Sequence, residues 1–229
     1  VFRQYNQLGI DFVQGYGLTE TSPILTLNPK EHYKETSVGR VIPQAEMKIL
    51  NPDERGAGEI AVKGPMVMSG YYEMPEETAE VFTDDHFFRT GDVGYLDREN
   101  YLYLTGRAKN LIVSEGGKNV YPEEIENAFQ LYGEIGQILV RGYPSDSPHG
   151  GELIEALIYP DEDFFAAGGP GAVDAAAATK EQITERLNAI VAEVNREQLQ
   201  PYQRISRTVV LGEAMEMTST KKIKRQTVN

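Results

Sequence analysis

The stretch GRAKN at residues 106–110 marks the point at which the sequence changes its pattern. Before it, short apolar runs of strand length alternate with turn-forming residues, which is typical of β-sheet. After it, helix-start signals and longer apolar stripes appear between the strand-like runs. We therefore predict an α+β fold in two parts, a β-rich subdomain at residues 1–106 and a small α+β domain at residues 107–229.

The first part has the strand and turn spacing of a small β-barrel or a distorted sheet. Apolar or alternating runs predict strands at residues 45–50, 58–63 and 101–105. The runs at 93–96 and 101–104, joined by four polar residues, predict a hairpin. Near the start, Phe12 and Val13 predict a short buried strand, which would turn tightly at the glycines that follow.

The second part combines helices and strands. Pro122 suits the first position of a helix, and Glu123 and Glu124 suit its positive N-terminal end. Residues 179–182 match a capping box, and the helix behind it would bury one stripe: Ile183, Leu187, Ile190, Val191 and Val194. Three strands are predicted, at residues 136–142, 153–159 and 208–211. The alanine- and glycine-rich residues 166–178 predict a loop.

Composition narrows the class of protein. The chain has 229 residues, 22 of them basic and 35 acidic, and a formal net charge of -13. This argues against a nonspecific nucleic-acid binder, which needs a basic face. The absence of cysteine excludes disulfides and thiolate chemistry, and His32, His86 and His149 lack the spacing of zinc ligands. No run approaches a membrane span and no signal peptide opens the chain, so we expect a cytoplasmic protein.

The motif GYGLTE, which begins at Gly15, has the composition of a nucleotide site. Gly15 and Gly17 allow the backbone close to a ligand, and Tyr16 offers a face on which a base can stack. The Thr19 hydroxyl can donate to a phosphate oxygen, and the Glu20 carboxylate can hold Mg²⁺. Taken alone, the hexapeptide fits a tight turn capped by threonine at least as well.

A second candidate is the motif Thr90-Gly91-Asp92. One carboxylate can accept hydrogen bonds from both vicinal hydroxyls of a ribose, and Arg107 could assist as a forked donor. A solvated turn aspartate and a surface arginine explain the same residues without a ligand.

Two further candidates lie in the second part. Gly116, Gly117 and Lys118 precede the helix at Pro122 and could line an anion site or a thiol tunnel, or form an ordinary loop. The tail TSTKKIKR at residues 218–225 could place one lysine against a phosphate, although charge runs are usually solvated.

The order of these motifs is more specific than any one of them. YGLTE, TGD, GRAK, GKNVYPEEIE and TSTKKIKR follow one another as in the adenylate-forming (acyl-activating) superfamily, and this chain resembles that family over essentially its full length. It looks most like the bacterial long-chain fatty-acid–CoA ligases. Such enzymes join a carboxylic acid to ATP with release of pyrophosphate, and CoA then displaces AMP. The resemblance implies ATP, Mg²⁺, CoA and a fatty acid as ligands, and no nucleic acid.

The resemblance also assigns roles to single residues. Adenine and the head of the acyl site would be lined by Gln14, Gly15, Tyr16 and Gly17. Thr19 would hold the α-phosphate, Glu20 the Mg²⁺, and Asp92 with Arg107 the ribose. The pantetheine tunnel would be lined by Gly116, Gly117 and Lys118.

Two lysines complete the set that the resemblance implies. Lys109 matches the hinge about which the C-terminal domain of the family turns between the two half-reactions. Lys222 matches the lysine that bridges the substrate carboxylate and the α-phosphate during adenylation. Lys221 stands where many members have glycine, and fatty-acid ligases often have a basic residue there.

One family motif does not occur in the chain. The Ser/Thr/Gly-rich phosphate loop that ends in Pro-Lys is missing ahead of Gly15. We therefore expect a C-terminal fragment of a longer ligase, which is inactive when isolated. A carrier-protein-loading enzyme for amino or aryl acids, and a non-catalytic nucleotide-binding or interaction module, stay open as alternatives. Acyl chain length, oligomeric state and peripheral membrane contact of the longer protein are left open too.

Overall fold

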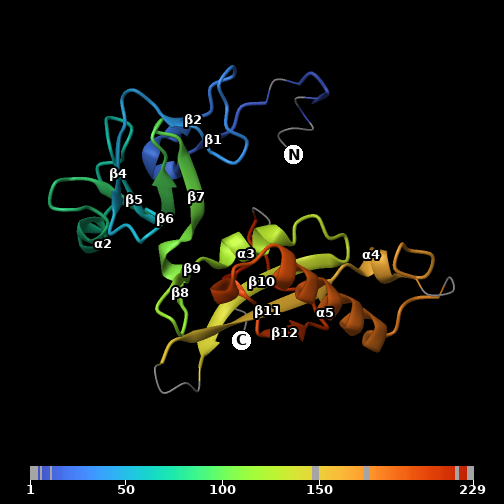
Figure 1. Cartoon of the computed structure of the whole chain (residues 1–229). Coiled ribbons are helices and arrows are strands. Elements are labelled where there is room, and N and C mark those ends of the chain that lie inside the picture. Colours follow the sequence, from blue (N-terminus) through green and yellow to red (C-terminus); the bar gives the residue numbers. More distant parts are fainter. Residues whose placement is uncertain are drawn as a thin grey trace. The chain divides into compact units, whose positions relative to one another are not determined.

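The computed structural model describes residues 5, 7–10, 12–145, 150–172, 176–219 and 222–225. The chain divides into two compact units, Val1–Lys109 and Asn110–Asn229 (Figure 1). Each unit has its own apolar core. His149 and Lys221 lie outside the described residues.

The first unit begins with a small antiparallel sheet of β1 (Gly15–Tyr16), β2 (Thr26–Leu27) and β3 (Arg40–Val41). The prediction of a buried strand at Phe12 and Val13 is wrong, because pairing starts at Gly15 and the two side chains are 38% and 43% exposed. The Phe12 ring stacks on the ring of Tyr5 at 5.3 Å between centroids. A short apolar run becomes a buried strand only where other elements cover it, and no core cluster of the described residues includes either side chain.

The larger sheet of this unit is a four-stranded antiparallel meander. Its strands pair in the order β4 (Glu46–Leu50), β5 (Gly58–Lys63), β6 (Phe88–Leu96) and β7 (Leu102–Arg107). The predicted strands and hairpin are confirmed, although β6 starts earlier than expected, at Phe88. Register shifts after Glu59 and Val93 distort the sheet. The pairing among the described residues leaves β4 and β7 as edges, so it shows the distorted sheet and not a closed barrel.

Side chains from both sheets meet in one core. Its buried members are Leu25, Val38, Ile60, Val62, Phe88 and Leu102. A short helix, α2 (Pro75–Glu80), precedes β6 and was not expected from the sequence. Its proline at the first turn and its two acidic residues there are nevertheless ordinary helix-start signals.

The second unit packs helices on a three-stranded sheet. Its elements are β8 (Ile112–Val113), β9 (Asn119–Val120), α3 (Pro122–Ala128), β10 (Ile135–Pro144), β11 (Glu152–Pro160), α4 (Glu162–Phe165), α5 (Lys180–Glu197), η3 (Pro201–Gln203) and β12 (Arg207–Val210). The sheet order is β10-β11-β12, antiparallel and then parallel. All three predicted strands and both predicted helices are confirmed. None of the helices among the described residues is long and apolar enough to cross a membrane.

The sheet of the second unit has an apolar cluster on each face, because successive residues of a strand point to opposite sides. Val140 and Ile158 belong to the large cluster that includes the buried side chains of α3 and α5. Their neighbours Leu139 and Leu157 belong to a smaller cluster that is completed by Met215 and Ile223 of the C-terminal segment. Two side chains of the C-terminal segment, Met215 and Ile223, are therefore part of the core.

One carboxylate is buried in this sheet between two arginines. Glu155 of β11 is 2% exposed, and its oxygens lie 2.7 Å from Arg141 Nε and 2.5 Å from Arg207 Nη2. Burial acts to raise the pKa of Glu155, but the two guanidinium groups outweigh it and hold the pKa below its ordinary value of 4.5. The two arginines are only partly covered, at 36% and 52% side-chain exposure.

The capping box at the start of α5 yields a first testable prediction. Thr179 Oγ1 accepts a hydrogen bond from Gln182 N at 3.3 Å, and Thr179 N donates to Gln182 Oε1 at 2.9 Å. We expect Thr179→Ala to lower the free energy of unfolding by about 1 kcal/mol. The backbone N of Gln182 loses its acceptor, and the hydrogen bond from Thr179 N to the Gln182 side chain loses the partner bond that holds its geometry. Urea denaturation followed by helix circular dichroism measures the change. Thr179→Ser is the control and should stay close to the parent; an equal loss in both variants contradicts the capping role.

Candidate nucleotide and acyl-transfer site

The motifs GYGLTE and TGD meet in the first unit at a single carboxylate. The Tyr16 hydroxyl donates to Asp92 Oδ2 at 2.7 Å, and Arg107 Nε lies 2.7 Å from Asp92 Oδ1. Asp92 is 8% exposed, whereas the Arg107 side chain is 43% exposed. The structure thus joins three predicted site residues from β1, β6 and β7 in one contact group, which we call the Asp92 cluster.

Local backbone geometry explains how Asp92 reaches this place. Gly91 has a φ of 69°, in the left-handed region that favours glycine, and it lies where β6 departs from regular pairing with β5. Thr90 anchors this irregularity, since its buried hydroxyl donates to the Ile60 carbonyl at 2.9 Å and accepts from Asp92 N at 3.1 Å. Each residue of the motif TGD therefore has a structural role that does not depend on a bound ligand.

The surroundings of Tyr16 in the Asp92 cluster keep its phenol protonated. Burial and the neighbouring Asp92 charge raise the pKa of the Tyr16 phenol far above its ordinary value, so the phenol stays a hydrogen-bond donor. Each carboxylate oxygen has a second lone pair. Asp92 thus uses one carboxylate oxygen for Tyr16 and the other for Arg107.

The predicted phosphate and metal residues lie on the 3₁₀ turn η1 (Thr19–Thr21). Thr19 is exposed and Glu20 is half-buried. The turn is closed by Thr21, whose hydroxyl accepts from Leu18 N at 2.9 Å, so the capping threonine is not Thr19. Tyr71 was missed by the sequence reasoning, and its hydroxyl donates to Glu20 Oε1 at 3.3 Å. Tyr71 and Glu20 come together only in the folded chain, so no local sequence pattern could have linked them.

The glycines of GYGLTE are explained by the chain itself. A Cβ on Gly17 would lie 1.6 Å from the Pro23 carbonyl oxygen, and one on Gly15 would lie 2.8 Å from the Thr26 carbonyl oxygen. Neither glycine has a positive φ. Close approach of the backbone therefore requires glycine at both positions: strand β2 lies against Gly15, and the connection between η1 and β2 lies against Gly17. Gln14, just before them, is half-buried and its carbonyl accepts from Asn28 N at 2.7 Å.

The close approach at Gly17 yields a second prediction. We expect Gly17→Ala to lower the free energy of unfolding of the first unit by about 1–3 kcal/mol, because the new methyl group meets backbone that has to move. Thermal unfolding of the 229-residue chain measures the change. Gly212→Ala is the matched control, since a Cβ there meets nothing within 4 Å and its backbone is unstrained. Equal midpoints for the two variants contradict the packing argument.

In the second unit, Gly116, Gly117 and Lys118 form the tip of the β8–β9 hairpin. The turn is closed by Ser114 N donating to the Lys118 carbonyl at 3.0 Å. Gly117 has a φ of 69°, which explains that glycine, but a Cβ on Gly116 would meet nothing within 4 Å. Packing among the described residues therefore leaves Gly116 unexplained.

The two predicted lysines are both exposed. Lys109 lies on η2 (Ala108–Asn110), at the end of the first unit. Lys222 lies in the C-terminal segment of the second unit, where its backbone N donates to Thr218 Oγ1 at 3.1 Å. Burial of the Lys222 side chain within its own unit would have excluded the adenylation role, and the structure shows it exposed.

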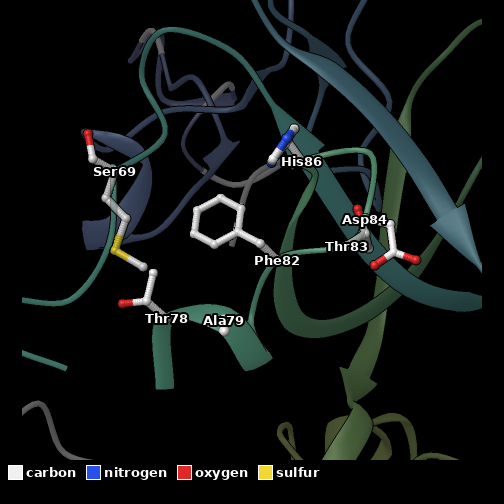
Figure 2. A pocket seen from close by; sticks show the side chains of 8 residues that line it. Ser69, Thr78, Ala79, Phe82, Thr83, Asp84 and His86 are labelled. Carbon is white, nitrogen blue, oxygen red and sulfur yellow. The ribbon is translucent and has the colours of Figure 1, made fainter. Parts of the chain in front are cut away.

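A pocket of about 620 Å³ in the first unit involves none of the predicted site residues. Figure 2 shows the Phe82 ring at its centre, between Thr78 and Ala79 of α2 on one side and His86 on the other. Ser69, Thr83 and Asp84 contribute at its margin. Its lining has no group of charged residues that converges on one point.

The chain is similar to known proteins over parts of its sequence. Residues 1–72 match the family described as AMP-binding enzyme, which includes the motif GYGLTE. The curated relatives and the solved structure to which the chain is similar are CoA ligases and a CoA synthetase.

Similar proteins act on different acids. The chain is 44% identical to a 2-succinylbenzoate–CoA ligase of Oceanobacillus iheyensis over 60% of its length, and 40% identical to a long-chain-fatty-acid–CoA ligase of Bacillus subtilis over 66%. It spans 29% and 27% of these relatives' length. In structure it resembles the O-succinylbenzoate CoA synthetase of Bacillus subtilis in complex with ATP and Mg²⁺, with a TM-score of 0.76, 26% identity, and coverage of 98% of this chain and 42% of that one.

Proposed function

We propose that this chain is the C-terminal part of a longer ATP-dependent long-chain fatty-acid–CoA ligase. The observation that carries the proposal is the Asp92 cluster, in which Tyr16, Asp92 and Arg107 come together from three strands. The family-like order of the motifs around it, from GYGLTE to the Lys222 tail, supports the same function. Under this proposal residues 1–106 end the large domain, residues 107–229 form the mobile domain, and Lys109 is the hinge.

The residues present fit the proposed ligands. Asp92 would accept the ribose hydroxyls, and Tyr16 would line the adenine pocket with Gln14, Gly15 and Gly17. Glu20 is a hard oxygen donor that the Tyr71 hydroxyl orients on one side, which suits Mg²⁺. Bound Mg²⁺ would offset negative charge on the phosphates.

Thr19 and Lys222 would serve the reacting phosphate. A carboxylate attacks an anionic phosphate slowly, because the two groups repel each other, and a positioned ammonium offsets that repulsion. Thr19 is exposed on η1 and would donate to the α-phosphate. Lys222 would bridge the carboxylate and the α-phosphate during adenylation.

The second half-reaction would use the β8–β9 hairpin. Gly116 has open space around its Cα and no packing reason to be glycine, which fits the close passage of a thin, flexible chain such as pantetheine. The positive φ of Gly117 allows the tight turn, and the Lys118 carbonyl closes it by accepting from Ser114 N. The hairpin would therefore line the path of CoA.

An aryl acid is the second candidate substrate. The identity to one 2-succinylbenzoate–CoA ligase, at 44%, is higher than the 40% identity to a long-chain-fatty-acid–CoA ligase. We favour the fatty acid because the loop Gly116-Gly117-Lys118-Asn119 resembles the fatty-acid branch of the family.

Pyrophosphate exchange tests the function. The full-length protein should exchange label between pyrophosphate and ATP with palmitate, and less with 2-succinylbenzoate, ferulate or an amino acid. Asp92→Asn should raise the KM for ATP on the order of tenfold, because one ribose acceptor is lost. The 229-residue chain alone should release no pyrophosphate.

Several outcomes contradict the proposal. Exchange with an aryl acid alone would replace the fatty acid as substrate, and exchange with an amino acid alone would favour a carrier-protein-loading enzyme. Absence of exchange with every acid, while AMP still binds, would indicate a non-catalytic nucleotide-binding module.

A further inference from the structure

The C-terminal segment is fixed to the second unit on both sides of Lys222. Before the lysine, the Gln137 side chain of β10 binds the backbone of Met215, accepting from its N at 2.6 Å and donating to its carbonyl at 3.3 Å. After the lysine, Ile223 packs against the apolar cluster of Leu139 and Leu157. Residues on either side also pair with each other, as the bridge between Met217 and Ile223 shows.

Arg225 adds an ionic contact two residues beyond that bridge. Its Nη2 lies 2.6 Å from both carboxylate oxygens of Glu126 in α3, and its Nη1 donates to the Val140 carbonyl at 2.8 Å. Glu126 also accepts from Val140 N at 2.7 Å. The pair thus satisfies both backbone groups of one residue on β10, a strand at the edge of its sheet.

The contact network continues toward the start of the unit. Glu123, one turn before Glu126 in α3, lies 3.7 Å from Arg225 Nη2 and accepts from Asn110 Nδ2 at 2.5 Å. Asn110 is the first residue of the second unit and follows Lys109. The residue after the proposed hinge and the segment that carries Lys222 therefore meet at the first turns of α3.

Stability alone accounts poorly for this network. Glu126 is largely buried, and burial raises the pKa of its carboxyl even though Arg225 acts in the opposite direction. Glu123 Oε2 is buried without a hydrogen-bond partner among the described residues. Burying charges and leaving an acceptor unpaired both cost free energy, and an apolar pair would attach the segment at lower cost. What an apolar pair lacks is direction, which the forked guanidinium supplies through hydrogen bonds from both of its Nη atoms.

We propose that Arg225, held by Glu126 and the Val140 carbonyl, is a positioning residue that fixes the backbone around Lys222 for the adenylation step. The proposal rests on the proposed function of Lys222. It adds a second requirement to that function: the ammonium has to be presented by a backbone held in one place, since a small displacement of a reacting group costs much of its rate.

Kinetics of the separate half-reactions in the full-length ligase provide the test. We expect Arg225→Met to lower the kcat of adenylation by a factor on the order of 10–100, with little change in the KM for ATP. Thioester formation from supplied acyl-AMP and CoA should stay within about twofold, because Lys222 has no task in it. Arg225→Lys, which keeps the charge but not the fork, should recover part of the adenylation rate.

Amide hydrogen exchange of the 229-residue chain tests the attachment without any chemistry. In Arg225→Met the amides of Lys222 and Ile223 should exchange on the order of tenfold faster, while those of α5 stay protected. Lys224→Met is the matched control, since it removes a neighbouring positive charge whose Nζ lies 3.3 Å from Glu216. It should change neither exchange nor either half-reaction.

The outcomes separate the two proposals. Faster exchange at Lys222 with unchanged adenylation overturns the positioning role, and so does an equal fall of both half-reactions together with loss of protection in α5. If Arg225→Met does not fold, Glu126→Gln and Arg225→Lys must show the selective loss of adenylation, and its absence in both overturns the role. If Lys222→Ala itself leaves adenylation intact, the function proposed for Lys222 fails, whatever Arg225 does.

Discussion

Under the proposed function, we expect Lys222→Ala, made in the full-length protein, to slow formation of the acyl-adenylate by a factor on the order of 10²–10³. The lysine would supply the positive charge that offsets repulsion between the substrate carboxylate and the α-phosphate. Thioester formation from supplied acyl-AMP should persist at about its original rate, because the positive charge of Lys222 would be needed only in the adenylation step, which precedes the attack of CoA. Pyrophosphate release and acyl-CoA formation, measured separately, give the two rates.

Lys224→Ala is the control for this experiment. It removes another exposed lysine of the same segment, which pairs with Glu216. Both half-reactions should keep their rates in this variant. An equal loss of the two half-reactions in Lys222→Ala contradicts the assignment of Lys222 to adenylation.

The largest expected effect on stability concerns the buried carboxylate of Glu155. We expect the double variant Arg141→Met and Arg207→Met to lower the free energy of unfolding by about 3–5 kcal/mol at pH 7, because it leaves a buried charge without its partners. Urea denaturation measures the change. A triple variant that also carries Glu155→Leu should regain most of the loss, since no buried charge remains.

The pH dependence follows from the pKa of Glu155, which lies below its ordinary value of 4.5. A carboxyl with a lowered pKa contributes stability at pH values above 4.5, and this contribution is lost as the pH falls through the pKa of the folded state. Without the arginines, burial raises the pKa instead. The difference in stability between the parent and the double variant should therefore be large at pH 7 and shrink toward pH 4. A constant difference across this range contradicts the ionic explanation.

Elements with a local signal were predictable from the sequence. The capping box at Thr179 predicts where α5 begins, and its apolar stripe predicts which face is buried. The structure confirms both predictions. Strands β10 and β11 are long apolar runs and were found within one or two residues of their ends. The β8–β9 hairpin was missed, because strands of two residues have no periodicity to read.

Contacts between distant residues were beyond the sequence. Tyr16 and Asp92 are 76 residues apart, and Glu126 and Arg225 are 99 apart. Both members of each pair lie in motifs that the sequence singled out, but nothing in either motif says which side chain meets which. Gly17 is a related case: glycine was expected for a turn or a ligand, and the structure shows that the nearby Pro23 carbonyl excludes a side chain.

The attachment of the segment around Lys222 has a thermodynamic consequence. With Gln137 holding Met215 on one side and Glu126 holding Arg225 on the other, the backbone near the lysine loses its conformational entropy when the second unit folds. That loss then does not recur in each catalytic cycle, and only the rotamers of one long side chain remain to be ordered when the substrates bind. Loosening the attachment should accordingly make the activation entropy of adenylation more negative.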